Sequence, residues 1–250
     1  MNAMDNGPDF PKLEPARRPF AGTPCERLRA VQARIAHAAA DAGRDAATVR
    51  LLAASKTFDA ATVRAMAACG QQAFGENYLK EALDKQAALR DLPLVWHFIG
   101  PIQSNKTRAI AENFSWVHGV DRLKIAERLS AQRPPSLPPL MICIEVNVSG
   151  EASKGGVAVA ELPALAEAVS KLPGLRLRGL MAIPAPTPDV AAQRAAFRQV
   201  RQAYHALIAC GHALDTLSMG MSADLDAAIL EGATIVRIGS ALFGERTKNA

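Results

Sequence analysis

The chain has 250 residues, of which 49% are hydrophobic and 21% are charged, an ordinary balance for a globular protein. A chain of this length can bury a full core without disulfides or metals. The formal net charge of +5 is spread along the chain, and only 5% of residues are aromatic. Without basic runs interleaved with aromatic residues, nucleic acid is not expected as a partner.

Residues 1–22 are rich in Pro, Asn, Asp and Arg and lack the apolar segment of a secretory signal. We expect a disordered tail over residues 1–22 and a single domain over residues 23–250. No stretch reaches the roughly 18 apolar residues of a membrane span. The cytoplasm is therefore the expected location, with no membrane partner.

Four cysteines are present, none in a C-x-x-C pair. Cys69, Cys143 and Cys210 lie in apolar contexts, which predicts small buried side chains in a reducing compartment. The five histidines share no helical metal-type spacing with a nearby carboxylate. We therefore predict no metal site.

A leading amphipathic helix is predicted over residues 23–40, because Leu28, Val31 and Ile35 recur at helical spacing. Short apolar runs then alternate with helical stretches. The predicted strands cover 51–55, 72–74, 94–99, 116–118, 140–146, 175–180, 214–217 and 234–238. The predicted helices cover 59–69, 78–89, 106–113, 122–131, 159–170, 190–209 and 223–230, and the short segment after the last strand is taken as the eighth.

Eight alternating strands and helices imply parallel strands with right-handed crossovers. The number eight favours closure into a single (β/α)8 TIM barrel of the α/β class. The alternative is a doubly wound sheet, which usually has a glycine-rich first turn. The first strand here ends in SKTF, without glycine. In a barrel, function sits where the strands end at their carboxyl side.

Lys56 directly follows the first strand. A lysine at the barrel mouth is partly desolvated, which lowers the pKa of its amine and frees it as a nucleophile. A Schiff base with an aldehyde is the natural chemistry. The alternative is a solvated, inert lysine at the rim, which is the commoner fate of a lysine taken alone.

The second strand ends in FGENY, where Glu76 and Asn77 present polar groups at the mouth. The alternative for this segment is a plain turn with a capping asparagine. In the third strand, His97 could point inward beside a ligand. A strand histidine is more often a hydrogen-bonded group of the core.

The loops after the seventh and eighth strands suggest a phosphate site. Ser218 opens the segment SMGMS, and Gly239 and Ser240 follow the last strand. Barrels commonly bind phosphate with these two loops and a short extra helix. Backbone N–H groups and hydroxyls at a helix start suit a dianion. The alternative is two ordinary turns.

Arg237 lies two residues before Gly239 in the last strand, so both share one side of the sheet. An inward-facing arginine is costly without a partner. One suitable partner is the nitrogen of a bound pyridine ring, which a permanently cationic arginine would keep unprotonated. The alternative partner is a barrel carboxylate such as Glu145.

Several segments together resemble the pyridoxal phosphate (PLP) homeostasis protein family, whose fold resembles the barrel domain of alanine racemase. They are SKTF, FGENYLKE, WHFIGPIQSNK, VHGVDR, EVNVSGEASKGG, LRGLMAIP, LSMGMSADLDAAI and GATIVRIGSALFGER. The resemblance covers residues 51–246.

The resemblance implies a role for individual residues. Lys56 would hold PLP covalently as an aldimine, and Arg237 would contact the pyridine nitrogen. Asn77 would lie near the cofactor, and Met221 and Met181 would pack near its ring or phosphate. The phosphate would be bound by Ser218, Gly239 and Ser240.

The resemblance also implies a carrier that binds, buffers and delivers PLP, with apo PLP-dependent enzymes as expected partners. Related racemases use a second, β-rich domain that supplies a tyrosine base, and we expect none here because the chain ends soon after the last strand. We therefore expect no catalytic residues and no robust turnover, and a monomer rather than a dimer. One alternative is a weak one-domain PLP-dependent amino-acid racemase with an unseen base such as His97. Another is an aldolase-like barrel using Lys56 on a sugar phosphate, which leaves Arg237 unexplained.

Overall fold

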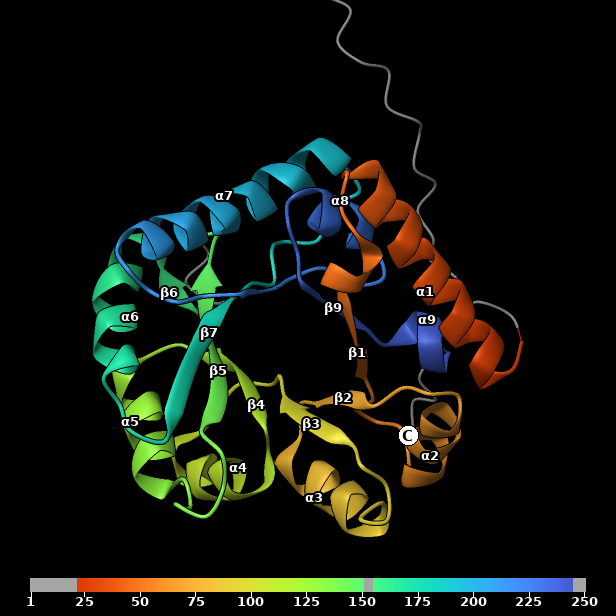
Figure 1. The fold of residues 1–250 in the computed structure, drawn as a ribbon, viewed down its shortest axis with the longest axis horizontal. Helices are drawn as coiled ribbons and strands as arrows, with labels where there is room; N and C mark the ends of the chain where they lie inside the picture. Colours follow the sequence, from red (N-terminus) through yellow and green to blue (C-terminus); the bar gives the residue numbers. More distant parts are fainter. Residues whose placement is uncertain (1–21, 151–154, 245–250) are drawn as a thin grey trace, which may run out of the picture.

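The computed structural model describes residues 22–150 and 155–244. The expected tail over residues 1–22 lies outside this part of the chain, except for Gly22. The described chain forms a closed ring of parallel strands surrounded by helices (Figure 1). Neighbouring strands follow the order β4-β3-β2-β1-β9-β8-β7-β5, and the pairing of β4 with β5 closes the ring. The prediction of a (β/α)8 TIM barrel is confirmed.

Each predicted strand is present, and no strand end differs from its predicted position by more than two residues. A two-residue strand that the sequence did not predict, β6, pairs with β5. The strands are β1 (Arg50–Ala54), β2 (Ala73–Glu76), β3 (Val95–Phe98), β4 (Trp116–Val120), β5 (Leu140–Asn147), β6 (Val157–Ala158), β7 (Leu175–Met181), β8 (Thr216–Ser218) and β9 (Ile235–Ile238).

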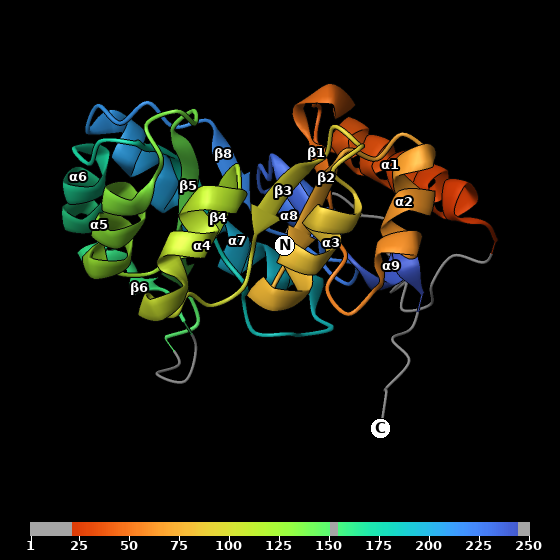
Figure 2. The ribbon, with the colours of Figure 1, turned by 90° about the horizontal axis from the view of Figure 1, so that it is seen from below.

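The helices follow the strands and cover the outside of the ring (Figures 1 and 2). They are α1 (Pro24–Asp41), α2 (Ala60–Ala68), α3 (Leu79–Ala88), α4 (Thr107–Asn113), α5 (Leu123–Gln132), α6 (Leu162–Ser170), α7 (Val190–Ala209), α8 (Leu225–Leu230) and α9 (Ser240–Phe243). Short 3-10 turns cover Ala46–Thr48, Ser104–Lys106 and Val159–Glu161. Among the described residues, no helix is long and apolar enough to cross a membrane.

Helix α1 begins at a capping box: the Thr23 hydroxyl accepts from the Glu26 amide, and the Glu26 carboxylate accepts from the Thr23 amide. The three apolar residues that predicted this helix, Leu28, Val31 and Ile35, are all buried. Helix α1 packs against α2, α8 and α9. It therefore covers the two strands, β1 and β9, at which the chain enters and leaves the barrel (Figure 1).

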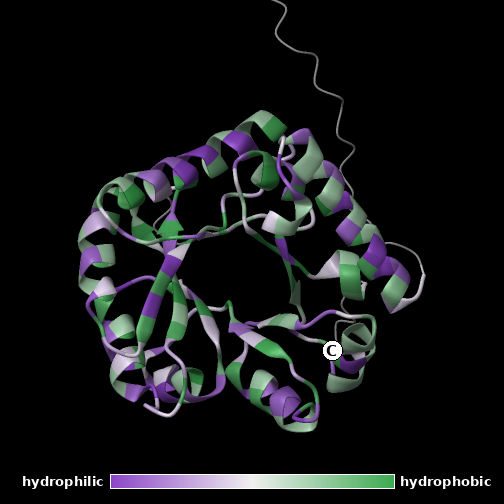
Figure 3. Cartoon of the chain, viewed as in Figure 1, coloured by the Kyte–Doolittle hydropathy of each residue, from purple (hydrophilic) through white to green (hydrophobic). Residues whose placement is uncertain are grey.

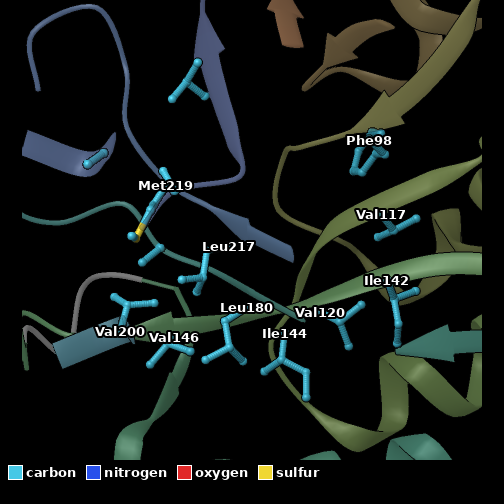
Figure 4. Close-up of a cluster of buried hydrophobic side chains, with 14 of the residues drawn as sticks. Phe98, Val117, Val120, Ile142, Ile144, Val146, Leu180, Val200, Leu217 and Met219 are labelled. Atoms are coloured by element: carbon cyan, nitrogen blue, oxygen red, sulfur yellow. The ribbon is translucent and has the colours of Figure 1, made fainter. Parts of the chain in front are cut away.

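The main core lies between the strands and the helices. Along β5, Ile142, Ile144 and Val146 are buried at every second residue, as expected for one face of a strand. Figure 4 shows these side chains packed with Leu180, Leu217 and others in one apolar cluster. The outer helices alternate between hydrophobic and hydrophilic residues (Figure 3), which fits helices that bury one face.

The interior of the ring differs from this apolar layer. Trp116, Cys143 and Met181 form a small separate cluster inside it, and further along the strands the buried side chains are polar. His97, His118, Ser218 and Arg237 are each at most 5% exposed. Buried polar groups need hydrogen-bond partners, so this interior is where a functional arrangement is expected.

The cysteines differ from the prediction. Cys25 in α1 forms a disulfide with Cys69 after α2, with a Cα–Cα distance of 5.1 Å. Cys143 is buried as predicted, whereas Cys210 is exposed. The prediction of small buried thiols was therefore wrong for Cys69 and Cys210, and the disulfide does not fit the reducing compartment predicted from the cysteine pattern. Apolar neighbours in sequence did not reveal that α1 crosses α2 at this point.

Candidate functional site

Two loops meet at the carboxyl end of the barrel after β8 and β9. The hydroxyl oxygens of Ser222 and Ser240 lie 3.4 Å apart, although the two residues belong to different loops. Ser240 is exposed and is the first residue of the short helix α9. This pair of hydroxyls beside backbone N–H groups is the arrangement expected for an anion site at these two strands.

Two glycines let these loops take their paths. Gly220 has φ +94°, and a Cβ there would lie 2.5 Å from the Cβ of Ala228. A Cβ on Gly239 would lie 3.2 Å from the carbonyl oxygen of Ala54, at the end of β1. The chain after β9 therefore passes close to the end of the first strand, where only a glycine fits without displacement.

Lys56 follows β1 by two residues and is half-buried. Strand β1 pairs with β9, with Ala53 opposite Ile238, so the loop carrying Lys56 lies beside the loop carrying Gly239. The rings of Phe58 and Phe243 stack with centroids 4.9 Å apart, which ties the two loops together. Lys56 and the loop after β9 therefore share one edge of the barrel mouth.

Arg237 points into the barrel and is 5% exposed. Its Nη1 donates to the carbonyl and hydroxyl oxygens of Ser218, at 2.5 and 2.9 Å, and its Nη2 donates to the carbonyl of Ala182 at 3.0 Å. Burial lowers the pKa of the guanidinium. Within the described chain, Arg237 makes no hydrogen bond or ion pair with Glu145, the alternative partner considered from the sequence.

Ser218 connects Arg237 to two buried histidines. The Ser218 hydroxyl lies 2.8 Å from Nδ1 of His118, and Nε2 of His118 lies 2.9 Å from Nδ1 of His97. Arginine can only donate, so the Ser218 oxygen accepts from Arg237. The Ser218 proton can then go to His118, and the His118 Nε2–H to His97, which assigns the tautomers from the network.

Both histidines are neutral near neutral pH. Burial lowers the pKa of His97 to about 3 and holds the pKa of His118 well below its usual value of 6.5. The His97 ring stacks on Trp116 with centroids 5.4 Å apart. Two arginines, Arg50 and Arg178, lie over the Trp116 ring from 5.4 and 4.9 Å. His97 is thus a buried, hydrogen-bonded group in the interior of the barrel.

The remaining predicted residues occupy different depths. Asn77, which follows β2, is half-buried, and its Oδ1 is buried without a hydrogen-bond partner among the described residues. Met221 is 40% exposed at the rim, whereas Met181 is 1% exposed inside the barrel. The orphaned amide oxygen of Asn77 fits a position that a ligand donor completes.

Helix α1 supports the loop after β8 from outside. Nη1 of Arg34 donates to the carbonyl of Ser222 at 2.8 Å, and its guanidinium is paired with the Asp226 carboxylate, with Nη2 at 2.5 Å from Oδ2. The leading helix therefore fixes the backbone beside one of the two hydroxyls. Its contribution to the site was not apparent from the sequence.

The structure separates Ser218 from the other residues predicted to bind phosphate. Ser218 is fully buried and bonded to Arg237 and His118, whereas Gly239 and Ser240 lie at the mouth. The hydroxyl beside Ser240 is that of Ser222, which the sequence analysis missed. The signal was present, because Ser222 closes the same SMGMS segment that Ser218 opens.

On the opposite side of the mouth, a cavity of about 170 Å³ is lined by Glu145, Val146, Asn147, Gly155 and Ile183. Burial raises the pKa of the Glu145 carboxyl. No group of three or more His, Cys, Asp and Glu residues in the described chain is arranged to hold a metal ion. The arrangement as a whole places a lysine, a pair of serine hydroxyls and a buried arginine at the carboxyl end of the barrel.

Residues 27–247 match the family described as alanine racemase, N-terminal domain, which defines the class of barrel. The chain is 66% identical over 228 residues to the pyridoxal phosphate homeostasis protein of Pseudomonas aeruginosa, covering 91% of this chain and 98% of the relative. It is 50% identical over 222 residues to the Escherichia coli protein of the same name, covering 88% and 95%. The chain therefore belongs to the pyridoxal phosphate homeostasis protein family, as its motifs predicted.

Solved structures agree with this assignment. PipY of Synechococcus elongatus with PLP bound is 37% identical, has a TM-score of 0.78, and is matched over 88% of this chain and 100% of its own. Alanine racemase from Corynebacterium glutamicum is 21% identical with a TM-score of 0.61, over 89% of this chain and 63% of its own. The second similarity shows the fold alone.

Proposed function

We propose that this protein binds PLP at the barrel mouth through Lys56, and buffers and delivers the cofactor in vitamin B6 homeostasis without robust turnover. PLP supplies an aldehyde that condenses with a lysine amine. The observation that carries the proposal is the convergence of Lys56 with the loops of Ser222 and Ser240 on adjacent strands. The structure of PipY, which is 37% identical to this chain, was solved with PLP bound. This supports PLP as the ligand here.

Each part of PLP has a matching group in this chain. The hydroxyls of Ser222 and Ser240, with the backbone at Gly239, would bind the phosphate. Arg237 would donate to the pyridine nitrogen and keep it unprotonated, which weakens the ring as an electron sink. Asn77 would use its orphaned amide oxygen beside the cofactor. The binding of phosphate by Ser218 stays a prediction. In this structure the Ser218 hydroxyl accepts a hydrogen bond from Arg237.

The racemase alternative requires an acid or base on each face of the cofactor. His97, the second base suggested by the sequence, is bonded to His118 and has a pKa lowered to about 3, so it is a poor base. The aldolase alternative still gives Arg237 no role. Both observations favour a PLP carrier. We further propose that residues 23–250 work as one domain, as a monomer in the cytoplasm, with apo PLP-dependent enzymes as acceptors.

Transfer of PLP tests the delivery function. The PLP-loaded protein is mixed with an apo-aminotransferase, and recovery of aminotransferase activity is followed with and without a trap for free PLP. We expect recovery, and no D-amino acid when the loaded protein is incubated with each L-amino acid. Strong, substrate-specific turnover of an amino acid would overturn the carrier proposal.

A further inference from the structure

The backbone beside Lys56 is strained. Thr57 has φ +71° and is the only non-glycine residue with positive φ in the described chain. A β-branched residue rarely adopts this left-handed conformation, because its Cβ substituents crowd the backbone. Such strain persists only where the surroundings enforce it, and it is often found at functional sites. The contacts that enforce it here come from helix α3.

A buried lysine of α3 lies at the centre of these contacts. Nζ of Lys85 donates to the carbonyl of Ser55 at 2.7 Å, to Oε1 of Glu76 at 2.7 Å and to Oε1 of Glu81 at 2.5 Å. An ammonium has three protons, so each has an acceptor. Lys85 is 4% exposed and Glu76 is 0% exposed.

The two carboxylates that accept from Lys85 also bind the residues on both sides of Lys56. The Thr57 amide donates to Oε1 of Glu81 at 2.6 Å, and the Ser55 hydroxyl donates to Oε1 of Glu76 at 2.6 Å. The Phe58 amide closes the turn on the Ser55 carbonyl at 3.1 Å. The residues before and after Lys56 are therefore both fixed by oxygens that Lys85 organises.

Stability alone does not account for this buried charge cluster. Burying a lysine and a carboxylate costs solvation that their attraction often fails to recover, and well-packed apolar residues frequently do as well. Oε2 of Glu76 is also buried without a hydrogen-bond partner among the described residues, and burial raises the pKa of this carboxyl. The cluster is better explained by the turn that it holds.

We propose that Lys85 is a positioning residue for Lys56: through Ser55, Glu76 and Glu81 it holds the strained turn at Thr57 that directs the Lys56 amine to the PLP site. This inference rests on the proposed function of Lys56. Lys85 touches neither the cofactor nor the reacting atoms. Lys85 affects the rate at which Lys56 reacts with PLP, because it fixes the backbone around Lys56 before the cofactor binds.

The first test replaces Lys85 without leaving a buried charge. The double variant Lys85→Met/Glu76→Gln is compared with wild type and with Lys80→Met, which changes an exposed lysine of the same helix. Two quantities are measured: the rate at which the visible Schiff-base band forms when PLP is added, and the amide exchange of residues 55–58 in PLP-free protein. We expect band formation to slow at least tenfold and exchange to accelerate at least tenfold in the double variant, with neither change in Lys80→Met.

The two proposals fail in different ways. A folded double variant with wild-type band formation and wild-type exchange overturns the positioning role of Lys85. A wild-type protein that forms no band overturns the proposed function, while the exchange measurement still reports whether Lys85 holds the turn.

The variant Thr57→Gly provides a second test of the proposal if the double variant does not fold. Glycine accepts a positive φ without strain, so the thermal midpoint of the PLP-free protein should be unchanged or higher. Glycine allows the turn more conformations, so the Thr57→Gly protein should nevertheless form the Schiff-base band at least threefold more slowly. If the turn had only a structural role, the thermal midpoint and the rate of band formation should change together. A wild-type rate of band formation in Thr57→Gly contradicts the proposal.

Discussion

The guanidinium of Arg237 lies 2.9 Å from the hydroxyl of Ser218, and this contact joins the last two strands of the barrel to the buried histidines. Three carbonyl and hydroxyl oxygens hold Nη1 and Nη2 of Arg237, so the barrel itself fixes the cation. A fixed cation needs little reorganisation when a ligand arrives. Ser218 therefore belongs to the support of Arg237, while Ser222 and Ser240 face the mouth.

Replacing Arg237 with methionine should lower both stability and PLP affinity. The substitution removes the Arg237 donor from the Ser218 hydroxyl and the Ala182 carbonyl, while the Ser218 carbonyl keeps the Ala182 amide as a donor. We expect this loss to cost about 2–4 kcal/mol in the free energy of unfolding. PLP affinity should fall about tenfold, as for the loss of one hydrogen bond to a charged donor. Urea unfolding and PLP titration measure the two effects. Arg176→Met, at an exposed position of β7, is the matched control, and equal behaviour of the two variants contradicts the assignment.

The serines can be separated by comparing PLP with pyridoxal, which lacks the phosphate. Ser222→Ala and Ser240→Ala should each weaken PLP binding about three- to tenfold, the value of one hydrogen bond, and leave pyridoxal binding unchanged. Ser218→Ala should affect both ligands alike, because it acts through Arg237. Equilibrium dialysis measures the affinities. A loss specific to PLP in Ser218→Ala would instead support the sequence prediction that Ser218 binds the phosphate.

Acid should destabilise the protein through its buried histidines. The pKa of His97 is lowered from 6.5 to about 3 by burial, so the unfolded chain binds a proton that the folded chain rejects. The contribution of neutral His97 is complete above pH 6.5 and is lost as the pH falls from 6.5 towards 3, by up to about 1.4 kcal/mol per pH unit. Urea unfolding at pH 7.5 and 5.0 measures this. His97→Gln should reduce the dependence of the free energy of unfolding on pH, whereas His37→Gln, at an exposed position, should not. An equal dependence on pH in the two variants contradicts this role of His97.

The disulfide between Cys25 and Cys69 should stabilise the fold. It spans 44 residues, and closing a loop of that size in the unfolded chain contributes about 2–4 kcal/mol. Thermal unfolding with and without a reductant is the measurement, with Cys25→Ser as the variant. Reduction should lower the midpoint of the wild type and leave Cys25→Ser unchanged. The exposed Cys210→Ser should behave as wild type, and a wild-type midpoint that does not respond to reductant argues against the bond.

The barrel was predictable because its signals are local. The helix over residues 190–209 has the same bounds in the sequence prediction and in α7, since Asp189 caps its start and its apolar face is periodic. The eight strands are short apolar runs between such helices. Strand β6 was missed because two residues carry no periodicity.

The polar interior was harder to predict because it depends on contacts between distant strands. His97 and His118 are 21 residues apart, and His118 and Ser218 are 100 apart, so no local pattern joins them. The contacts of Cys25 with Cys69 and of Arg34 with Ser222 arise in the same way, from the placement of α1. Lys56 and Arg237 could be predicted as site residues because each stands at an expected place in a strand or just after one.

The most direct test of the account concerns Lys56. PLP is added to the purified protein and to Lys56→Ala, the absorption spectra are recorded, and both samples are reduced with borohydride and digested for mass spectrometry. The account predicts a visible band in the wild type that is absent from the variant, and a pyridoxyl adduct on the peptide that carries Lys56. A wild type without the band, or an adduct confined to another lysine, would contradict it.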